Sequence, residues 1–338
     1  MSAAAAVLFW MVVLPAAPVR TTAIDVSTLL KQVGLQAGDV QKIERGDVVG
    51  RTTDADSSAV ALVVAGRVAV PPTYYLERLR VIESFKKSPE ILQIGRVGVP
   101  PAPSQFVNLT LDNADVDDLR GCRVQDCGLK LSAEAITRLA RRDAQALTAS
   151  AAMREFLADY AGKYLQAGNA SLIEYNDGSR PKRLADELRV ITPHFGYLQR
   201  GWPTLHDAIA GFAGTLPDGI EHFLYWSKEK IGPRAVVSMT HVLISPLRDG
   251  TAAAASKQIY ASHYSNASVG LTLLIDQGTE AAPRTLVIYV NRSRLDIFDG
   301  LFAGIKRPLV RSRARDGAER TMRRLRDRLE ADYKTTRQ

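Results

Sequence analysis

Histidines are the residues whose chemistry could most directly serve catalysis, and two of them lie on neighbouring expected strands. The five are His194, His206, His222, His241 and His263. Strands expected over 235–245 and 257–264 would let His241 and His263 face each other. Paired imidazoles can bind a metal or move protons near neutral pH. Because no third ligand is evident, we expect structural histidines and no metal site, and keep His241 and His263 as the catalytic candidates.

Motifs that announce a particular chemistry are missing from the sequence. It has no Gly-x-Ser-x-Gly elbow, no phosphate-binding Gly-x-x-x-x-Gly-Lys loop, no dinucleotide fingerprint and no His-Glu-x-x-His pair. Each of these motifs positions a nucleophile, a phosphate or a zinc ion. The sequence therefore predicts no cofactor, and it names no reaction.

Aromatic side chains gather on expected strands near the end of the chain: Tyr225, Trp226, Tyr260, Tyr264 and Tyr289. Alternation along a strand would put Tyr260 and Tyr264 on one face and Lys257 and His263 on the other. If the tyrosine face points inward, it lines a cavity with rings that carry hydroxyls and orient an amphipathic ligand. If it points outward, these are ordinary strand residues. The candidate ligand-binding residues are Trp226, Tyr260, Tyr264 and Tyr289.

Four acids, Asp112, Asp115, Asp117 and Asp118, precede the cysteines. Carboxylates are the hard oxygen ligands that calcium prefers. Their spacing is not that of an EF-hand, and the glycine and final glutamate of that loop are absent. We expect a solvated acidic loop over 112–118.

The only cysteines are Cys122 and Cys127. Their spacing is not that of a Cys-x-x-Cys zinc pair, and no second pair exists. An oxidising compartment would allow them to pair. We expect a disulfide whose short loop gives about 2 kcal/mol of stabilisation, with free thiols as the alternative.

Positive charge is concentrated near the C-terminus. Of the net charge of +8, the segment 306–328 carries +7. An apolar stripe runs through this segment at helical spacing: Ala318, Met322, Leu325 and Leu329. The arginines are either a solvated helix face or a contact for anionic lipid head groups. The candidate membrane-facing residues are Arg320, Arg323, Arg324 and Arg328.

An apolar run, Ala3 to Leu14, opens the chain and is followed by Pro15 and small residues. It is too short to span a bilayer and is typical of a secretory signal peptide. No Lys or Arg precedes it, so a retained anchor or a buried helix are alternatives. We expect residues 1–23 to be a signal peptide and the mature protein to be periplasmic or secreted. Nucleic acid is then not a partner, and no motif for it appears.

The remaining chain divides by its periodicity into three parts. Residues 24–114 combine a helical lead-in, a strand over 60–70, a helix over 74–85 and a strand over 107–111. Residues 115–215 are mainly helical, with helices expected over 133–146, 148–167, 183–192 and 203–213. Residues 216–338 contain five strands, over 222–227, 235–245, 257–264, 268–276 and 285–291, and then a long helix. At 46% hydrophobic residues, a folded core is expected throughout.

This order of elements resembles the START-like (SRPBCC) helix-grip superfamily. The strand that ends in Val68-Ala-Val-Pro-Pro72, the helix after it, the consecutive late strands and the C-terminal helix carry the resemblance, over roughly 59–99 and 220–332. It implies an α+β fold in which a curved antiparallel sheet grips the C-terminal helix around an apolar cavity. The segment 115–215 would then be a helical insertion. The runs 122–131 and 257–264 are also similar to those of uncharacterised bacterial secreted proteins, which implies no activity.

Three function classes follow from these observations. The first is an exported soluble protein that binds or transfers a hydrophobic or lipid-like small molecule, with an anionic membrane surface as a further partner. The second is an enzyme, a cyclase, lyase or hydrolase, that uses His241, His263 or Tyr260 as acid or base. The third is a structural or interaction protein. The interior discriminates among them, because a cavity with few ionisable groups favours binding and converging shifted groups favour catalysis.

Overall fold

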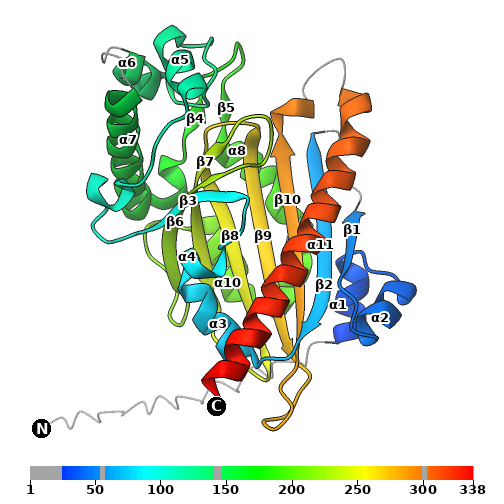
Figure 1. Ribbon diagram of the computed structural model, residues 1–338. Coiled ribbons are helices and arrows are strands. Elements are labelled where there is room, and N and C mark those ends of the chain that lie inside the picture. The colour runs from blue at the N-terminus through cyan, green and yellow to red at the C-terminus, as the bar shows by residue number, and fades with distance from the viewer. Residues whose placement is uncertain (1–24, 54–57, 141–145, 299–302, 338) are drawn as a thin grey trace, which may run out of the picture.

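The computed structural model describes residues 25–53, 58–140, 146–298 and 303–337. The expected signal peptide lies outside these ranges. The fold is α+β, and its centre is an 8-stranded antiparallel sheet in the order β1-β2-β10-β9-β8-β7-β6-β3 (Figure 1). The strands of this sheet are β1 (Val49–Thr53), β2 (Ala59–Val68), β3 (Ile91–Val97), β6 (Glu221–Glu229), β7 (Val236–Ile244), β8 (Thr251–Ala261), β9 (Ser265–Asp276) and β10 (Thr285–Leu295). Two short strands, β4 (Glu174–Tyr175) and β5 (Lys182–Arg183), pair with each other.

Helices precede the sheet strands, interrupt them and follow them. They are α1 (Val26–Gln32), α2 (Ala37–Glu44), α3 (Pro72–Arg80), α4 (Ile82–Phe85), α5 (Asn113–Gly121), α6 (Ala133–Ala140), α7 (Ala146–Ala167), α8 (Leu184–Ile191), α9 (Gly196–Gly201), α10 (Pro203–Gly211) and α11 (Ala303–Thr336). Four single 3₁₀ turns join them, at Pro103–Phe106, Gly168–Ser171, Thr192–Phe195 and Asp296–Phe298. The helices and strands expected from periodicity over 133–167, 183–213 and 222–291 are all present with shifted ends. No described helix has the length and apolar character that crossing a membrane requires.

Helices cover both faces of the sheet (Figure 1). One apolar cluster joins the sheet to α3, α4 and α11, and a second joins it to α1, α2 and α5–α10. Strand β2 shows the division, since Val64 and Val68 belong to the first cluster and Val63 and Ala65 to the second. Alternate residues of a strand point to opposite faces. This is why residues 59–65 of this strand are all apolar: each face meets its own helical layer.

The C-terminal helix α11 crosses one face of the sheet, as the stripe of apolar residues predicted. Met322 and Leu329 are buried there, and Ala318 and Leu325 pack against the same cluster. Close approach to β1 depends on Gly50, because a Cβ atom at this position would lie 2.7 Å from Cγ of Glu319. The Gly50 backbone N–H instead donates to Oε1 of Glu319 at 2.8 Å. Sequence and packing therefore agree on which side of this helix faces the core.

The helical middle of the chain packs on the opposite face and shares a core with the sheet. Tyr160 of α7 donates a hydrogen bond from its hydroxyl to the carbonyl of Ile259 at 2.7 Å, and its ring lies beside Tyr260. Segment 115–215 is thus a layer of the same folded unit.

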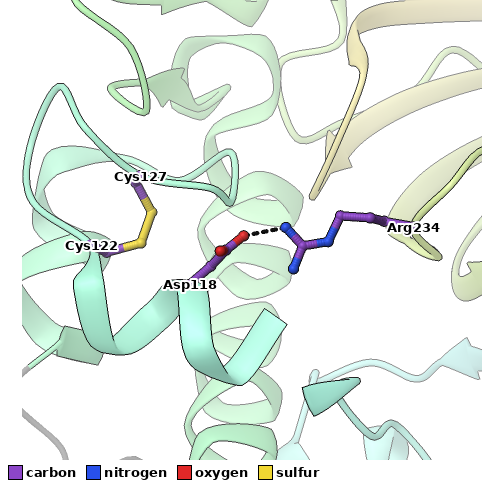
Figure 2. The surroundings of a disulfide bond; sticks show 4 residues. All are labelled: Asp118, Cys122, Cys127 and Arg234. Atoms are coloured by element: carbon purple, nitrogen blue, oxygen red, sulfur yellow. Dashed lines mark hydrogen bonds and ion pairs between the residues drawn. A yellow bond between two sulfur atoms is a disulfide. The ribbon is translucent and has the colours of Figure 1, made fainter. Parts of the chain in front are cut away.

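The predicted disulfide is confirmed, because Cys122 and Cys127 are bonded. This disulfide closes the loop after α5. Figure 2 shows that Asp118 lies near this disulfide and pairs with Arg234 of the β6–β7 hairpin. Arg234 also pairs with Asp115 at 3.2 Å. The disulfide-bearing loop is therefore held to the sheet through its own helix.

Two expectations for the region before the disulfide are wrong. The segment 107–111 is not a strand; Leu109 and Leu111 are buried while Val107 is 60% exposed. Some of its backbone groups bond to side chains, as when the Leu111 N–H donates to Oγ of Ser150 at 3.0 Å, and the Leu109 N–H donates to the nearby carbonyl of Phe106 at 2.8 Å. The acidic stretch 112–118 is not a loop, because α5 begins directly after Asp112 and continues through it.

Candidate functional site

A cavity of about 370 Å³ lies between the sheet and the helices α3, α4 and α11. Its floor is formed by side chains from six strands: Val64, Tyr289, Thr272, Ala254, Ser256, Val242, Tyr225 and Glu229. Tyr75, Leu79, Ile82 and Phe85 of α3 and α4 form one wall, and Ala318, Met322 and Leu325 of α11 form the roof. The helical spacing of the wall residues was visible in the sequence. A cavity of this size, mainly apolar and with a few polar groups, has the usual character of a small-molecule site.

A partly buried ion pair lies at one end of this cavity. Nζ of Lys86 lies 2.6 Å from Oε1 of Glu229, and the two side chains are 26% and 18% exposed. Lys86 also donates to the hydroxyl of Tyr225 at 3.2 Å, and Ser227 donates to Glu229 at 2.6 Å. Burial tends to raise the pKa of Glu229, but the ammonium of Lys86 outweighs it and holds this pKa below its usual value. Burial likewise tends to lower the pKa of Lys86, and Glu229 raises it above its usual value. Both groups are therefore charged, and they neutralise each other.

Tyr289 supplies a hydroxyl from the floor of the cavity. Burial raises its pKa, so the phenol stays protonated. Nδ2 of Asn291 donates to this hydroxyl at 3.4 Å. Gly270 of β9, which is in register with Asn291, makes the room, since a Cβ atom there would lie 2.8 Å from the Tyr289 hydroxyl and 2.6 Å from Oγ of Ser256. A neutral hydroxyl can donate to or accept from a polar group of a ligand.

Two arginines of α11 close the rim. Nη1 of Arg324 lies 3.0 Å from Oε1 of Glu90, and both side chains are half-exposed. Arg328 donates to the backbone carbonyls of Phe85 and Lys87, at the end of α4. Since carbonyls are uncharged, Arg328 keeps a positive charge that no carboxylate of this rim neutralises. The exposed lining residues Lys87, Glu90 and Arg324 place the entrance between α11 and the segment that joins α4 to β3.

Of the four aromatic residues proposed for ligand binding, only Tyr289 lines the cavity. Trp226 is buried on the opposite face, stacked on Phe106, and its Nε1–H donates to the carbonyl of Gln105 at 3.0 Å. Tyr260 packs against Phe156 of α7. Tyr264 lies in the β8–β9 turn, where its hydroxyl accepts from the Arg234 N–H at 3.1 Å. Tyr225, noted in the sequence as one of the aromatic residues, also lines the cavity, together with Tyr75 of α3.

The alternation expected along β8 fails because the strand carries a bulge. Thr240 pairs with Gln258 and Met239 with Tyr260, so Ile259 is extra. A bulge shifts the alternation of side chains after it. Lys257 and Tyr260 consequently both face the helical layer, where Lys257 donates to the carbonyl of Ile209 and Tyr260 meets Phe156.

The two candidate catalytic histidines do not face each other. His241 is in register with Lys257, and its two ring nitrogens lie 2.9 Å from the Tyr164 hydroxyl and 3.0 Å from Nδ1 of His222. His263 lies beyond the end of β8, with Nε2 3.1 Å from Oδ1 of Asp115. Neither histidine lines the cavity. They belong to two separate contacts between the sheet and the helical layer.

His241 and its neighbours Lys257 and Tyr164 have shifted pKa values. Burial lowers the pKa of Lys257 to about 7. Nζ of Lys257 has only neutral partners, with Oδ1 of Asn169 at 2.7 Å and the carbonyl of Ile209 at 3.2 Å. Burial, followed by the nearby Lys257 and His222, lowers the pKa of His241 well below its usual value. Burial also raises the pKa of Tyr164 well above its usual value. This group is a hydrogen-bonded buried cluster on the face away from the cavity.

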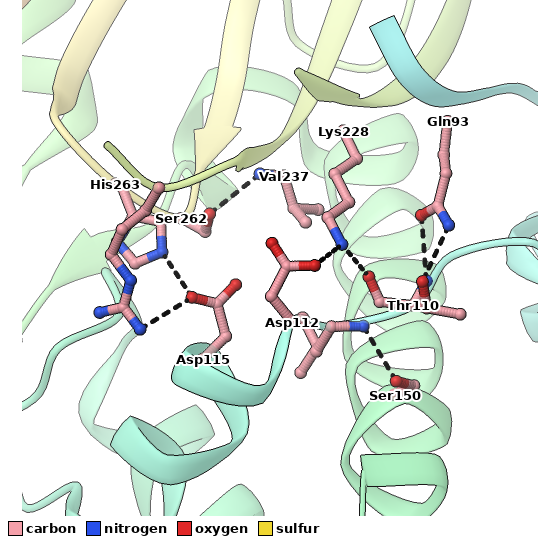
Figure 3. A network of polar contacts seen from close by, with 11 residues as sticks. Gln93, Thr110, Asp112, Asp115, Ser150, Lys228, Val237, Ser262 and His263 are labelled. Carbon is pink, nitrogen blue, oxygen red and sulfur yellow. Dashed lines mark hydrogen bonds and ion pairs between the residues drawn. The ribbon is translucent and has the colours of Figure 1, made fainter. Parts of the chain in front are cut away.

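The acidic residues Asp112, Asp115 and Asp118 have partners among the described side chains. Figure 3 shows Asp112 beside Lys228, whose Nζ lies 2.6 Å from Oδ1 and also donates to the carbonyl of Thr110 at 2.8 Å. Asp115 is 1% exposed, so the expectation of a solvated carboxylate was wrong for this residue. Among the described residues, no three His, Cys, Asp or Glu side chains are placed to hold a metal ion.

The other candidate membrane-facing arginines lie along α11. Arg323 donates to the carbonyl of Val48 at 3.1 Å and pairs with Glu319 at 2.8 Å. Arg320 is exposed and does not line the cavity. Arg320, Arg323 and Arg324 are exposed along α11, and of the three only Arg324 lines the cavity.

Comparison with known proteins finds no match to this chain: no family model, no curated protein and no solved structure. The geometry of the cavity is therefore the basis for the function proposed next.

Proposed function

We propose that this protein binds, and transfers, a hydrophobic or lipid-like small molecule in the cavity between the sheet and α11. The observation that supports this proposal is the cavity itself. Its volume is about 370 Å³, its wall is formed by Tyr75, Leu79 and Phe85, and its roof is formed by Met322 and Leu325. Removing apolar ligand surface from water there provides the driving force, at about 25 cal/mol per Å². An antiparallel sheet packed against a long C-terminal helix, with a cavity between them, supports assignment to the START-like helix-grip superfamily.

Export and a membrane partner belong to the same proposal. The disulfide Cys122–Cys127 is the kind of bond that persists outside the cytoplasm. Exposed Arg320 and Arg323 lie on the helix that forms the entrance, and basic residues near an anionic membrane gain about 1 kcal/mol each. Docking at such a surface would bring the entrance to the source of the ligand.

The experiment compares one variant that fills the cavity with one that adds the same side chain elsewhere. Thr272 lies on the cavity floor, whereas Thr137 is exposed on α6 in the opposite layer. We expect Thr272→Phe to lose binding of a neutral apolar dye such as Nile red, and Thr137→Phe to bind it as the original chain does. Native mass spectrometry of the purified protein should show a co-purifying small molecule that Thr272→Phe lacks. Equal dye binding by both variants, with unchanged far-UV circular dichroism, would remove this proposal.

An acid–base enzyme is the second candidate, and one observation favours it. The His222–His241–Tyr164 chain lies beside Lys257, whose pKa of about 7 suits proton transfer near neutral pH. Lys257 is 1% exposed, so a substrate would have to displace Asn169 or Phe212 to reach it. The interaction class is third, because both faces of the sheet are already covered.

A further inference from the structure

The charges at the entrance do not balance. Six charged side chains line the cavity where it opens between α4 and α11: Lys86, Lys87, Arg324, Arg328, Glu90 and Glu229. Four are cations and two are carboxylates, which leaves an excess of two positive charges. The opposite part of the cavity, around Val64, Tyr75 and Met322, is apolar. The site is therefore polarised, with a cationic entrance and an apolar interior.

The two carboxylates differ in how firmly they are held. Glu229 is enclosed, and it accepts from both Lys86 and Ser227 at 2.6 Å. Glu90 is 50% exposed and meets an equally exposed Arg324. An exposed pair of this kind contributes between 0 and about 1 kcal/mol, so water or another anion can replace Glu90 at little cost. Displacing Glu229 would instead leave the ammonium of Lys86 unpaired in a buried place.

Resting on the proposed function, we infer that the ligand is an amphiphile with an anionic head group, a carboxylate or a phosphate, which takes the place of Glu90 at Arg324 and Arg328. A guanidinium offers planar paired donors that match either anion. Arg328 is oriented by the carbonyls of Phe85 and Lys87 and retains its charge. The apolar chain of the ligand then lies under Leu325 and Met322, toward Val64.

The helix provides a matched control for this assignment. Arg320 lies one turn before Arg324 on α11, carries the same charge and is exposed, but it does not line the cavity. If α11 attracted anions in a general way, Arg320 and Arg324 would contribute equally to binding. If the head group binds at the entrance, Arg324 contributes and Arg320 does not.

The experiment displaces a neutral apolar dye from the full chain with four amphiphiles of one chain length: dodecanoate, dodecyl phosphate, dodecanol and dodecylamine, each below its micelle concentration. We expect the two anions to bind more tightly than dodecanol, and dodecylamine to bind least. Arg324→Gln should weaken both anions by about fivefold, the effect of one partly exposed cation, and leave dodecanol unchanged. Arg320→Gln should change none of them. Glu90→Gln should strengthen the anions, because it removes the carboxylate that competes with them.

Each contrary result has a definite meaning. Dodecanol that binds as tightly as dodecanoate, or an equal loss in Arg324→Gln and Arg320→Gln, overturns the head-group assignment and leaves the binding function standing. Inorganic phosphate that displaces dodecyl phosphate at millimolar concentration also overturns it, because the site then serves a free anion. If none of the four displaces the dye from the original chain, the proposed function fails as well.

Discussion

Lys86, which follows α4, and Lys257 of β8 are removed from water in two chemically different ways. Lys86 has a carboxylate partner in Glu229 at 2.6 Å, and its pKa is raised above its usual value against the effect of burial. Lys257 has only neutral oxygen partners, and burial lowers its pKa to about 7. An ammonium that loses hydration without gaining a counter-charge becomes a weaker base. The first lysine therefore contributes a fixed charge to the cavity, and the second contributes pH dependence to the fold.

The pH dependence has a definite sign. Lys257 has a folded pKa of about 7 against an ordinary value of 10.5. Between these values the unfolded chain binds more protons, so the free energy of unfolding rises with pH, by at most about 1.4 kcal/mol per pH unit. Below pH 7 both states are protonated and this contribution no longer changes. We expect Lys257→Met to lose this rise, measured by urea unfolding at pH 7, 8, 9 and 10. Parallel pH profiles for the variant and the original chain would contradict this account.

Removing the disulfide tests a second single-residue contribution. Cys122 and Cys127 enclose a short loop, and short loops gain the least from cross-linking. Cys122→Ser combined with Cys127→Ser should lower the free energy of unfolding by about 2 kcal/mol. Reduction of the original chain with dithiothreitol should give the same shift in urea midpoint, because both treatments break the same bond. A doubly substituted chain as stable as the oxidised protein would show that the loop needs no cross-link.

At the scale of elements, α11 has two roles that use different sides of the helix. Its apolar stripe roofs the cavity and packs on β2, while its flanking charged residues bond to elements on each side. Glu319 accepts from the Gly50 N–H on the β1 side, and Arg328 donates to the carbonyl of Lys87 on the α4 side. Helix α11 therefore packs on the sheet, covers the cavity and supplies two of the charged residues at the entrance, Arg324 and Arg328.

Truncating two leucines of α11 should separate its packing role from its roofing role. Leu329 is 1% exposed, and Leu329→Ala should cost about 2–4 kcal/mol, as for a buried leucine. Leu325 is only partly buried because it faces the cavity, so Leu325→Ala should cost less. Arg324→Ala should change stability by under about 1 kcal/mol. Urea midpoints of the three variants test this order; equal and small shifts for both leucines would show that α11 does not pack on the sheet as described.

How far the sequence predicts these elements depends on whether local spacing determines them. The apolar stripe of α11 and the strand expected over 60–70 rest on local patterns, and the structure has a helix and a strand there. The segment 107–111 has a local pattern too, an alternation of apolar and polar residues, but alternation shows only that a segment is extended with one side buried. A strand needs a neighbouring strand whose backbone can pair with it. Here two side chains that are distant in sequence bond to the backbone instead: Ser150 accepts from the Leu111 N–H, and Lys228 donates to the carbonyl of Thr110. Asp112 and Asp115 carried a signal for the start of α5 that was missed, since acids are favoured in a first helical turn.

Candidate site residues were harder to predict than elements, because the cavity is assembled from distant parts of the chain. Lys86 and Glu229 meet across more than a hundred residues, and neither stands in a recognisable motif. The bulge at Ile259 reversed the expected facing of Tyr260, and no spacing in β8 reveals a bulge. Tyr289 lines the cavity, and the sequence singled it out as an aromatic residue of an expected strand.

For the whole molecule, the sheet is the shared wall of two cores. Apolar residues of the helical middle, such as Met153, Leu157 and Leu205, belong to the same cluster as Ile259 and Leu273 of the sheet. Without that layer, one face of five long strands would be open to water, at a cost that grows with the apolar area exposed. The helical layer and the sheet should therefore unfold together.

Two buried tryptophans can report on the two layers separately. Trp202 lies in the helical layer before α10, and Trp226 lies on β6. In Trp226→Phe, Trp202 remains as the fluorescent reporter of the folded layers. In Trp202→Phe, Trp226 remains. Both variants also keep Trp10, which precedes the described residues. In each variant we expect fluorescence and far-UV circular dichroism to give one coincident urea transition, as a single cooperative unit requires. Comparing two probes within one variant removes the effect of each substitution on stability. Fluorescence of Trp202 that changes at lower urea than the circular dichroism would mean that the helical layer unfolds first and is a separate unit resting on the sheet.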